Sequence, residues 1–426
     1  MENPQTPSPG ARHVCVLGAG IIGLATAWQL QRAGHQVTVV DRATAGAGAS
    51  GANGAQLSYA YVQPLADPSI WRQLPKLLLA PDSPLQFRLQ PDPQQWAWGL
   101  QFLAACRASV SEQTTHRLLA LAGESRAGFD AWLQATGAQC DYTATGKLVL
   151  YGDATGFAAA RQQMALQQRL GSVQAALSPA ECAQVEPALA HYAPRVAGGI
   201  HTPGECAADC FKVCQALHDQ LVAGGARMVL GADITRLQRD GARVVAVETS
   251  LGRIAADAFV VSLGTGSPAL VRPLGVSLPV YPLKGYSITV PVNDDAVGGA
   301  TAVHTVHTVH TAPRVSVTDA ARKVVFARVG SRLRVAGMVE LRGEDRRIEP
   351  GRIASLVATA RDIFPGGGDY DRAEPWAGLR PATPRGEPVI GVSPRGPHNL
   401  VLNTGHGALG FTLAFGSALR VARLLR

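Results

Sequence analysis

The stretch VCVLGAGIIGLATAWQLQRAGHQVTVVD, residues 14–41, decides the fold. A β-branched and apolar run comes first, three glycines in the spacing G-x-G-x-x-G follow it, and a helix-forming run comes next. In such a strand–turn–helix unit, the phosphates of a dinucleotide bind at the helix N-terminus, where free N–H groups and the helix dipole favour an anion. The stretch therefore predicts a dinucleotide site in an α/β protein with a parallel sheet.

Each conspicuous residue of this unit has an expected task. Gly18 suits the tight turn, Gly20 leaves room for a pyrophosphate, and Gly23 lets the helix lie close to the strand. Asp41 ends the second apolar run at the distance where an acid that binds a ribose hydroxyl is expected. The alternative is a glycine-rich turn in an unrelated sheet. The candidate cofactor-binding residues of this unit are Gly18, Ala19, Gly20, Ile21, Ile22, Gly23, Asp41 and Arg42.

Composition limits the class of protein. A chain of 426 residues suits two domains, or a nucleotide domain with an insertion. No run approaches the ~20 apolar residues of a membrane span, so the expected compartment is the cytoplasm. The net charge is +8, but no Lys/Arg block or zinc-finger spacing accompanies it, so nucleic acid is not an expected partner.

One segment could contact a membrane surface. Residues 69–89 combine Trp71 with a leucine cluster and three basic side chains, a composition typical of an interfacial anchor. An ordinary helix that faces the core is the favoured alternative. If the segment is an anchor, we expect the protein at the inner face of the cell membrane.

No metal site is expected. The seven cysteines are scattered and contain no C-x-x-C pair, so they indicate neither a disulfide framework nor a zinc site. The repeat HTVHTVHT contains His304, His307 and His310, but no carboxylate or cysteine is placed to complete a metal shell.

The order of the patterns predicts a discontinuous nucleotide-binding domain. We expect a disordered lead at 1–12, a Rossmann-type cofactor domain from 13–83, 195–275 and 370–426, and an inserted α+β substrate domain from 84–194 and 276–369. The cofactor is either a nicotinamide dinucleotide or FAD. A glycine-rich loop at 45–58 and a strand–turn–helix at the C-terminal end favour one long cofactor held from both ends of the chain, and therefore FAD.

The sequence resembles the FAD-dependent D-amino acid oxidase family, and within it the branch of the bacterial D-amino acid dehydrogenase small subunits. The stretches that carry the resemblance are VLGAGIIGLATAWQL, SGANGAQLS, VEPAL, VYPLKGYSIT, RLRVAGMVE, WAGLRPATPRGEPVIG and LNTGHGALGFTLAFGS. The segment 294–322, with its histidine repeat, departs from the family pattern. The resemblance implies non-covalent FAD, a D-amino acid substrate, and products that are a 2-oxo acid and ammonia.

The resemblance also assigns residues to the cofactor site. It places residues 53–56 beside the flavin ring and the turn at 405–410 near the pyrimidine end of the flavin. The further candidate cofactor-binding residues are Ser50, Asn53, Gly54, Ala55, Gln56, Asp233, Gly264, Gly405, His406, Gly407, Leu409 and Gly410.

Arg380, in the motif GLRP, matches the arginine that binds the substrate carboxylate in this family. Its rigid and apolar setting suits a guanidinium that clamps a carboxylate at two points. Tyr281, Lys284 and Tyr286 are candidate catalytic residues on a strand expected to line the substrate side, but alternation does not reveal which face points inward. The implied reaction is hydride transfer from the substrate to flavin, which demands orientation more than a strong base.

The electron acceptor is not visible in the sequence, and a quinone, another carrier or oxygen would each fit. The alternative enzymes are a glycine or sarcosine oxidase and a D-hydroxyproline dehydrogenase. A flavin-dependent RNA-modifying enzyme and a non-catalytic FAD-binding protein are more distant alternatives.

Overall fold

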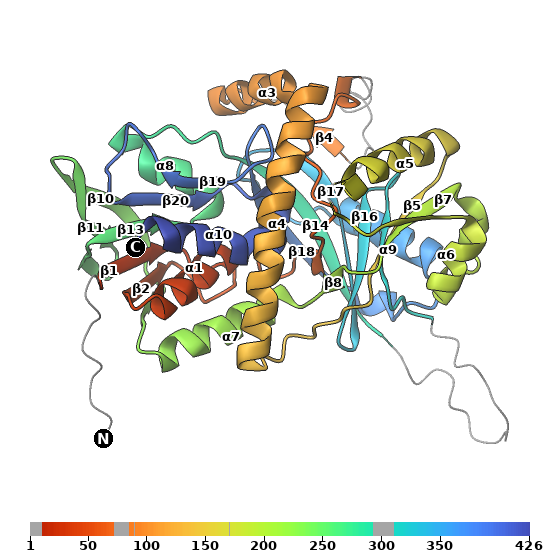
Figure 1. Ribbon diagram of the computed structural model, residues 1–426, viewed down its shortest axis with the longest axis horizontal. Helices are drawn as coiled ribbons and strands as arrows, with labels where there is room; N and C mark the ends of the chain where they lie inside the picture. The colour runs from red at the N-terminus through yellow and green to blue at the C-terminus, as the bar shows by residue number, and fades with distance from the viewer. Residues whose placement is uncertain (1–10, 72–84, 89, 170, 293–310) are drawn as a thin grey trace.

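The computed structural model describes residues 11–71, 85–88, 90–169, 171–292 and 311–426 (Figure 1). The expected disordered lead at 1–12 and the histidine repeat therefore lie mostly outside the described residues. Most of the leucine-rich segment 69–89 also lies outside them. Within the described part of the chain, no helix is long and apolar enough to cross a membrane.

A six-stranded sheet contains the glycine motif. Its strand order is β19-β20-β13-β1-β2-β9, and all neighbours are parallel except the pair β19–β20. The central strand β1 lies between β2 and β13, as expected of a Rossmann-type sheet. The strands are β1 His13–Leu17, β2 Gln36–Asp41, β9 Arg227–Leu230, β13 Ala258–Val261, β19 Val389–Val392 and β20 Leu400–Thr404.

Helices from both ends of the chain cover this sheet. Helix α1 packs against α10, and α10 packs in turn against the long helix α4, which runs between the two halves of the molecule (Figure 1). Their shared core is rich in small and aliphatic residues, with Trp132 and Phe129 of α4 against Phe415 of α10. The helices are α1 Ile21–Arg32, α4 Ala108–Thr136, α7 Cys210–Ala223 and α10 Gly410–Leu424.

A nine-stranded sheet forms the second half of the molecule. Its order is β18-β14-β17-β16-β15-β5-β7-β6, with β4 paired to β17. Helix α9, Pro350–Ile363, buries its apolar side against one face of this sheet. The strands are β4 Leu85–Phe87, β5 Lys147–Tyr151, β6 Ala175–Leu177, β7 Gly198–Thr202, β14 Tyr281–Pro291, β15 Ser316–Asp319, β16 Val324–Val329, β17 Arg332–Leu341 and β18 Glu374–Ala382.

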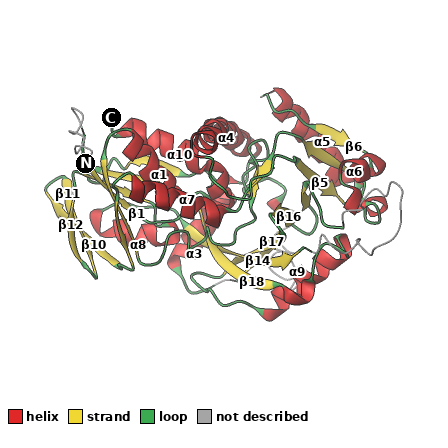
Figure 2. Cartoon of the chain, turned by 90° about the horizontal axis from the view of Figure 1, so that it is seen from below, coloured by secondary structure: helices red, strands yellow, loops and turns green. Residues whose placement is uncertain are grey.

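Smaller elements complete the molecule. A three-stranded sheet lies at one end of the long axis and helices α5 and α6 lie at the other (Figures 1 and 2). A two-stranded sheet joins β3, Gln56–Leu57, to β8, Cys206–Ala207. The remaining elements include β10 Ile234–Asp240, β11 Arg243–Thr249, β12 Gly252–Ala255, α3 Pro93–Ala105, α5 Ala154–Arg169, α6 Pro179–Val185 and α8 Ser267–Val271.

Two strands pair differently from the expected division of the chain. Strand β7 falls in the segment 195–275 and strand β18 in the segment 370–426, both of which we expected in the cofactor domain. Each instead hydrogen-bonds within the nine-stranded sheet. Sequence patterns indicate that a strand forms, but the partner of a strand is a non-local choice that the pattern does not contain.

Candidate active site

The glycine turn after β1 has the geometry that a dinucleotide needs. Gly18 has a φ of +112°, and a Cβ there would lie 2.5 Å from the carbonyl oxygen of Ser262. A Cβ on Gly23 would lie 1.8 Å from the Gly18 oxygen, so only glycine lets α1 pack this close to β1. The nearest atom to a Cβ on Gly20 is the Ser50 Oγ at 3.4 Å, which leaves room for a phosphate to approach the backbone.

Side chains around this turn hold its backbone. The Asp41 carboxylate accepts hydrogen bonds from the Ala19 N–H at 2.7 Å and the Ala43 N–H at 2.9 Å. The Ser50 hydroxyl accepts one from the Ile21 N–H at 3.1 Å. The N-cap of α1, Gly20, has no side chain to cap the helix, so the first turn of α1 suits an anion.

Ile22, Arg42 and Asp233, three other predicted cofactor residues, differ in burial. Ile22 is partly buried and packs against the main core, whereas Arg42 is exposed just beyond β2. Asp233 is exposed after β9, the neighbour of β2, and its N–H donates to the Ser250 Oγ at 3.0 Å.

A second turn approaches the same edge of the six-stranded sheet from the C-terminal end of the chain. Gly405 and Gly407 have φ values of +82° and +55°, and Gly410 begins α10 after Leu409. The N-terminus of α10 also lacks a side-chain cap. Its free N–H groups and the helix dipole suit the electron-rich end of a flavin, so this turn fits the predicted cofactor.

His406 in this turn is neutral. Burial lowers the pKa of its imidazole to about 3. Its Nε2 lies 2.8 Å from the Ser417 Oγ, and that hydroxyl donates to the Leu413 carbonyl. The hydroxyl has only one hydrogen to donate, so it accepts from His406, and Nε2 carries the imidazole proton.

The loop after the glycine motif lies on one face of the nine-stranded sheet. The carbonyls of Ala52 and Asn53 accept from Ser287 Oγ at 2.7 Å and Arg334 Nη1 at 2.9 Å. Ala55 has a φ of +59°, and its N–H donates to the Asn53 side chain at 2.9 Å. A Cβ on Gly54 would lie 3.1 Å from Val325, and Gln56 Nε2 donates to the carbonyls of Val317 and Phe326.

Arg380 lies on that same face. It is on β18, opposite Leu283 of β14, and its guanidinium covers Gly285, so that a Cβ there would lie 2.2 Å from Arg380 Cζ. Two residues further along β14, the side chain of Ser287 reaches the Ala52 carbonyl. Alternation along β14 therefore places Arg380 and the loop on one side of the sheet.

The Arg380 guanidinium has a single hydrogen bond among the described residues. Its Nη1 donates to the Met338 carbonyl at 2.9 Å. No carboxylate of the described residues lies within 4.0 Å of it. Burial lowers the pKa of Arg380 to about 10, so the group is still a cation at neutral pH.

The end of β18 joins this arginine to the cofactor turns. A Cβ on Gly264, which follows β13 with a φ of +58°, would lie 3.8 Å from Pro381 Cγ. Ala382 forms an isolated bridge with His406. The structure thus brings Arg380 together with predicted cofactor residues from three separate segments of the chain.

The structure does not bring the candidate catalytic residues Lys284 and Tyr286 to Arg380. Both alternate to the opposite face of β14. The Tyr286 hydroxyl donates to the Glu340 carboxylate at 3.0 Å, and burial raises the pKa of Tyr286. Lys284 is fully buried, donates to the Arg347 carbonyl, and lies 3.8 Å from Asp345.

Tyr281 occupies the same face as Arg380 but has a partner elsewhere. Its hydroxyl donates to the Asp92 carboxylate at 2.8 Å, and its ring packs against Trp98 of α3. Its observed contacts attach α3 to the sheet.

Sequence reasoning missed a buried polar cluster on the face that carries Arg380. The Lys147 ammonium donates to the Ser58 hydroxyl at 2.9 Å and lies 4.4 Å above the Tyr61 ring. Burial lowers the pKa of Lys147 to about 8. The Glu205 carboxylate accepts from the backbone N–H groups of residues 59–60, and burial raises its pKa. A lysine that opens a predicted strand gives no signal of burial, because most lysines in this position are solvated.

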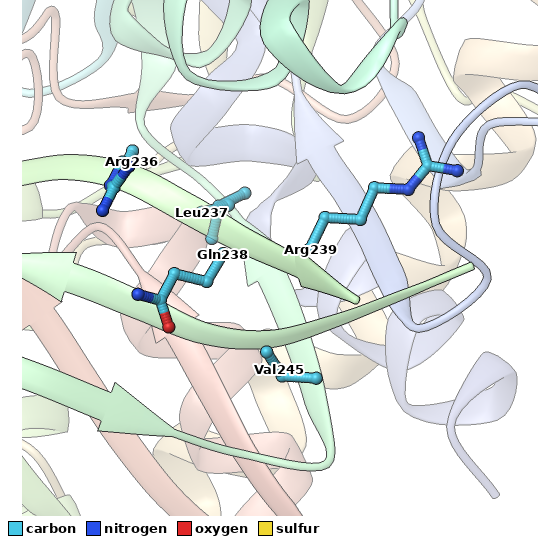
Figure 3. Close-up of a pocket in the computed structure, with 5 residues that line it drawn as sticks. All are labelled: Arg236, Leu237, Gln238, Arg239 and Val245. Carbon is cyan, nitrogen blue, oxygen red and sulfur yellow. The ribbon is translucent and has the colours of Figure 1, made fainter. Parts of the chain in front are cut away.

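One surface hollow contains none of the predicted site residues. A hollow on the hairpin β10–β11 is lined by Arg236, Leu237, Gln238, Arg239 and Val245 (Figure 3). In the described ranges, no three His, Cys, Asp or Glu side chains stand close enough to bind a metal ion. The repeat from His304 to His310 is outside those ranges.

Residues 13–424 match the family model of the FAD dependent oxidoreductases named DAO. The chain belongs to this DAO family. It is 45% identical over 423 residues to the D-amino acid dehydrogenase 2 of Ralstonia nicotianae, covering 97% of this chain and 96% of the relative. The D-amino acid dehydrogenase 2 of Pseudomonas aeruginosa is 46% identical over 415 residues, covering 97% and 94%.

Solved structures share the fold. The glycine oxidase of Bacillus cereus superposes with a TM-score of 0.72 at 19% identity, covering 97% of this chain and 95% of that one. The L-proline dehydrogenase of P. horikoshii superposes with a TM-score of 0.71 at 16% identity, covering 98% and 94%. The predicted FAD-binding α/β fold is therefore confirmed, and FAD is the cofactor of the family to which this chain belongs.

Proposed function

We propose that this DAO-family protein oxidises D-amino acids to the corresponding 2-oxo acids and ammonia, with its carboxylate-binding site at Arg380. The relatives at 44–46% identity are named D-amino acid dehydrogenases, which supports a D-amino acid as the substrate. The fold alone does not select the substrate, because enzymes named for glycine and for L-proline share it.

The observation that carries the proposal is the cation of Arg380, which has no counter-ion among the described residues. An ionised side chain that is buried without a counter-ion is costly, so such groups are normally paired in the functional state. The guanidinium uses one N–H for the Met338 carbonyl. Among the described residues nothing else occupies its remaining donors, which suit the two oxygens of a carboxylate.

The protein's own part in the reaction is mainly positional. FAD, when bound, supplies the two-electron acceptor for the hydrogen on the substrate α-carbon. Arg380 fixes the carboxylate, and a fixed carboxylate limits where the α-carbon and the amine can lie. Lys284 and Tyr286 point to the other face of β14, and Lys147, although on the face that carries Arg380, is on β5, which four strands separate from β18. This arrangement is consistent with a neutral amine entering the site and with no strong side-chain base.

Anaerobic mixing of the holoenzyme with single amino acids tests the proposed function. We expect D-amino acids to bleach the flavin absorbance, and their L-enantiomers to leave it unchanged. Bleaching by glycine or sarcosine alone would favour an oxidase for those compounds. An absence of bleaching by every amino acid tried would contradict the proposal.

The acceptor is a further part of the proposal: electrons pass to a quinone at a membrane surface. The outward side of α3 supports this, because Trp96 and Leu100 are exposed there at 50% and 68% and the helix contains no charged residue. Trp71 is also exposed and donates from Nε1 to the Cys106 carbonyl, just beyond the end of α3. Exposed tryptophan and leucine on an uncharged helix are typical of interfacial contact with lipid.

A further inference from the structure

A β-bulge stands next to the candidate site. Strands β14 and β17 pair regularly except between the residue pairs 284–340 and 286–337. There, two residues of β17, Met338 and Val339, oppose the single residue Gly285 of β14. A bulge of this kind inserts one residue, bends the strand and redirects its groups, and such bulges are common beside active sites.

Met338 adopts a backbone conformation that non-glycine residues rarely adopt. Its φ is +61°, in the left-handed region, although its side chain is buried in the core under α9. Strain of this sort persists only where the surroundings enforce it. The carbonyl of this same residue accepts the hydrogen bond from Arg380 Nη1 at 2.9 Å.

Gly285, on the other side of the bulge, has a complementary role. A Cβ at this position would lie 2.2–2.3 Å from the Cζ and both terminal nitrogens of Arg380. The guanidinium can therefore lie flat on the sheet only because residue 285 has no side chain. Its cross-strand neighbour Gly378 is covered in the same way by the Trp376 ring, which a Cβ would meet at 2.0 Å.

We propose that the bulge positions the Arg380 guanidinium for carboxylate binding, with the strained Met338 supplying the acceptor and Gly285 the flat surface. Met338 is then a positioning residue, since it acts only through Arg380. The inference rests on the proposed role of Arg380, and it adds that the backbone conformation at residue 338, rather than its side chain, sets the affinity for the carboxylate.

Substitutions at residue 338 separate backbone conformation from packing. Met338→Ile keeps the side-chain volume but is β-branched, so it resists the left-handed conformation. Met338→Leu keeps the volume without that branch. Met338→Gly favours the left-handed conformation but removes a buried side chain, so it lowers thermal stability.

The probe is propanoate, which is D-alanine without its amino group. Its dissociation constant from the oxidised holoenzyme is measured by calorimetry, with FAD content verified first. We expect Met338→Ile to raise this constant about tenfold or more, as loss of part of a charge-assisted contact does. We expect the Leu and Gly variants to bind propanoate as the wild type does, even though the Gly variant is less stable. If propanoate binding weakens across the residue-338 variants in the same order as their thermal stability falls, the inference is overturned.

Gly285→Ala gives a second and independent test. The added methyl group must displace the guanidinium, so propanoate binding should fall at least as far as in Met338→Ile. Gly152→Ala is the matched control, because a Cβ there meets only the Ala321 Cβ at 4.0 Å. Unchanged propanoate binding in Gly285→Ala would also overturn the inference.

Arg380→Met, measured in parallel, separates failure of the positioning inference from failure of the proposed carboxylate site. If it abolishes propanoate binding while Met338→Ile and Gly285→Ala do not weaken it, the positioning inference alone is wrong. If Arg380→Met binds propanoate normally, the proposed carboxylate site is wrong and the inference fails with it.

Discussion

We expect substrate recognition to depend on Arg380. Arg380→Met leaves the substrate carboxylate desolvated and unpaired, which should cost about 2–5 kcal/mol of binding. Arg380→Lys should recover only part, since an ammonium lacks the planar two-point fit. Both KM and the rate of flavin reduction at saturation should worsen, because the clamp also orients the α-carbon.

The matched comparison uses D-alanine and ethylamine, which lacks the carboxylate. Reductive half-reaction kinetics should show a large loss on D-alanine and little change on ethylamine. Equal losses on both compounds would remove Arg380 from the site.

His406 should make the protein sensitive to acid. Its folded-state pKa of about 3 lies below its ordinary value of 6.5, so the folded protein excludes a proton that the unfolded chain binds. The stabilisation is therefore complete above pH 6.5 and is lost as the pH falls toward 3. Between pH 7 and pH 5 we expect a loss of about 2 kcal/mol in the free energy of unfolding from this group.

Urea unfolding of wild type and His406→Gln at both pH values measures this contribution. Glutamine can still donate to the Ser417 hydroxyl but does not titrate. The wild type should lose about 2 kcal/mol more than the variant between pH 7 and pH 5. Identical losses in the two proteins would mean that His406 is protonated when folded.

Single residues differ in how far the sequence reveals them. Gly18 and Gly23 could be predicted because their constraints, a positive φ and a close backbone, are local and recur with fixed spacing. Lys284 and Tyr286 could not be placed, because alternation defines two faces but does not say which one is functional. Met338 follows Gly337 in β17, and a glycine within a strand can indicate a bulge, but the sequence does not show that Met338 takes the left-handed conformation.

At the scale of elements, the contact between α1 and β1 should control cofactor binding. Gly23→Ala puts a Cβ 1.8 Å from the Gly18 oxygen, so the helix must move away from the strand that shapes the phosphate turn. We expect the purified variant to contain little FAD. FAD released by acid precipitation measures the content, since we expect the attachment to be non-covalent.

Gly123→Ala on α4 is the control for this prediction. A Cβ there meets nothing within 4 Å, and alanine favours a helix over glycine by about 0.5–1 kcal/mol. This variant should keep its FAD and be as stable as the wild type or slightly more so. FAD content at the wild-type level in Gly23→Ala would contradict the role given to this glycine.

The element types and their order were largely predictable, but some partners were not. The strand–turn–helix units near both ends of the chain followed from glycine spacing and apolar runs. Strand β18 follows the segment 276–369 in sequence, and its motif GLRP precedes the C-terminal turn, so we grouped it with the cofactor domain. Its hydrogen bonds to β14 reflect side-chain packing across distant segments, which one sequence does not display.

At the scale of the whole molecule, the outward side of α3 should mediate contact with membranes. Trp96→Ser combined with Leu100→Ser should reduce co-sedimentation with vesicles that contain anionic lipid, and should slow turnover with a quinone held in those vesicles. Flavin bleaching by a D-amino acid should not change, because Trp96 and Leu100 are exposed, whereas Trp98 makes the contacts of α3 with β14 and β18.

Leu251→Ser provides the control on a different surface. Leu251 is 67% exposed, almost as much as Leu100, but it lies in the turn between β11 and β12 of the three-stranded sheet, at one end of the molecule. It should not alter vesicle binding. Equal sedimentation of all variants, or faster turnover with dissolved oxygen than with quinone, would contradict the membrane proposal.

The position of β13 between β1 and β20 has a consequence for biosynthesis. Strand β1 is complete at residue 17, whereas β20 and the helix that covers α1 are made only after residue 400. At ~5–20 residues per second, a ribosome needs roughly 20–80 s to synthesise the chain between β1 and β20. During that interval the nascent cofactor sheet lacks a parallel neighbour and one of its covering helices. We therefore expect FAD to bind after translation is complete. Until then, we expect the incomplete chain to depend on chaperones.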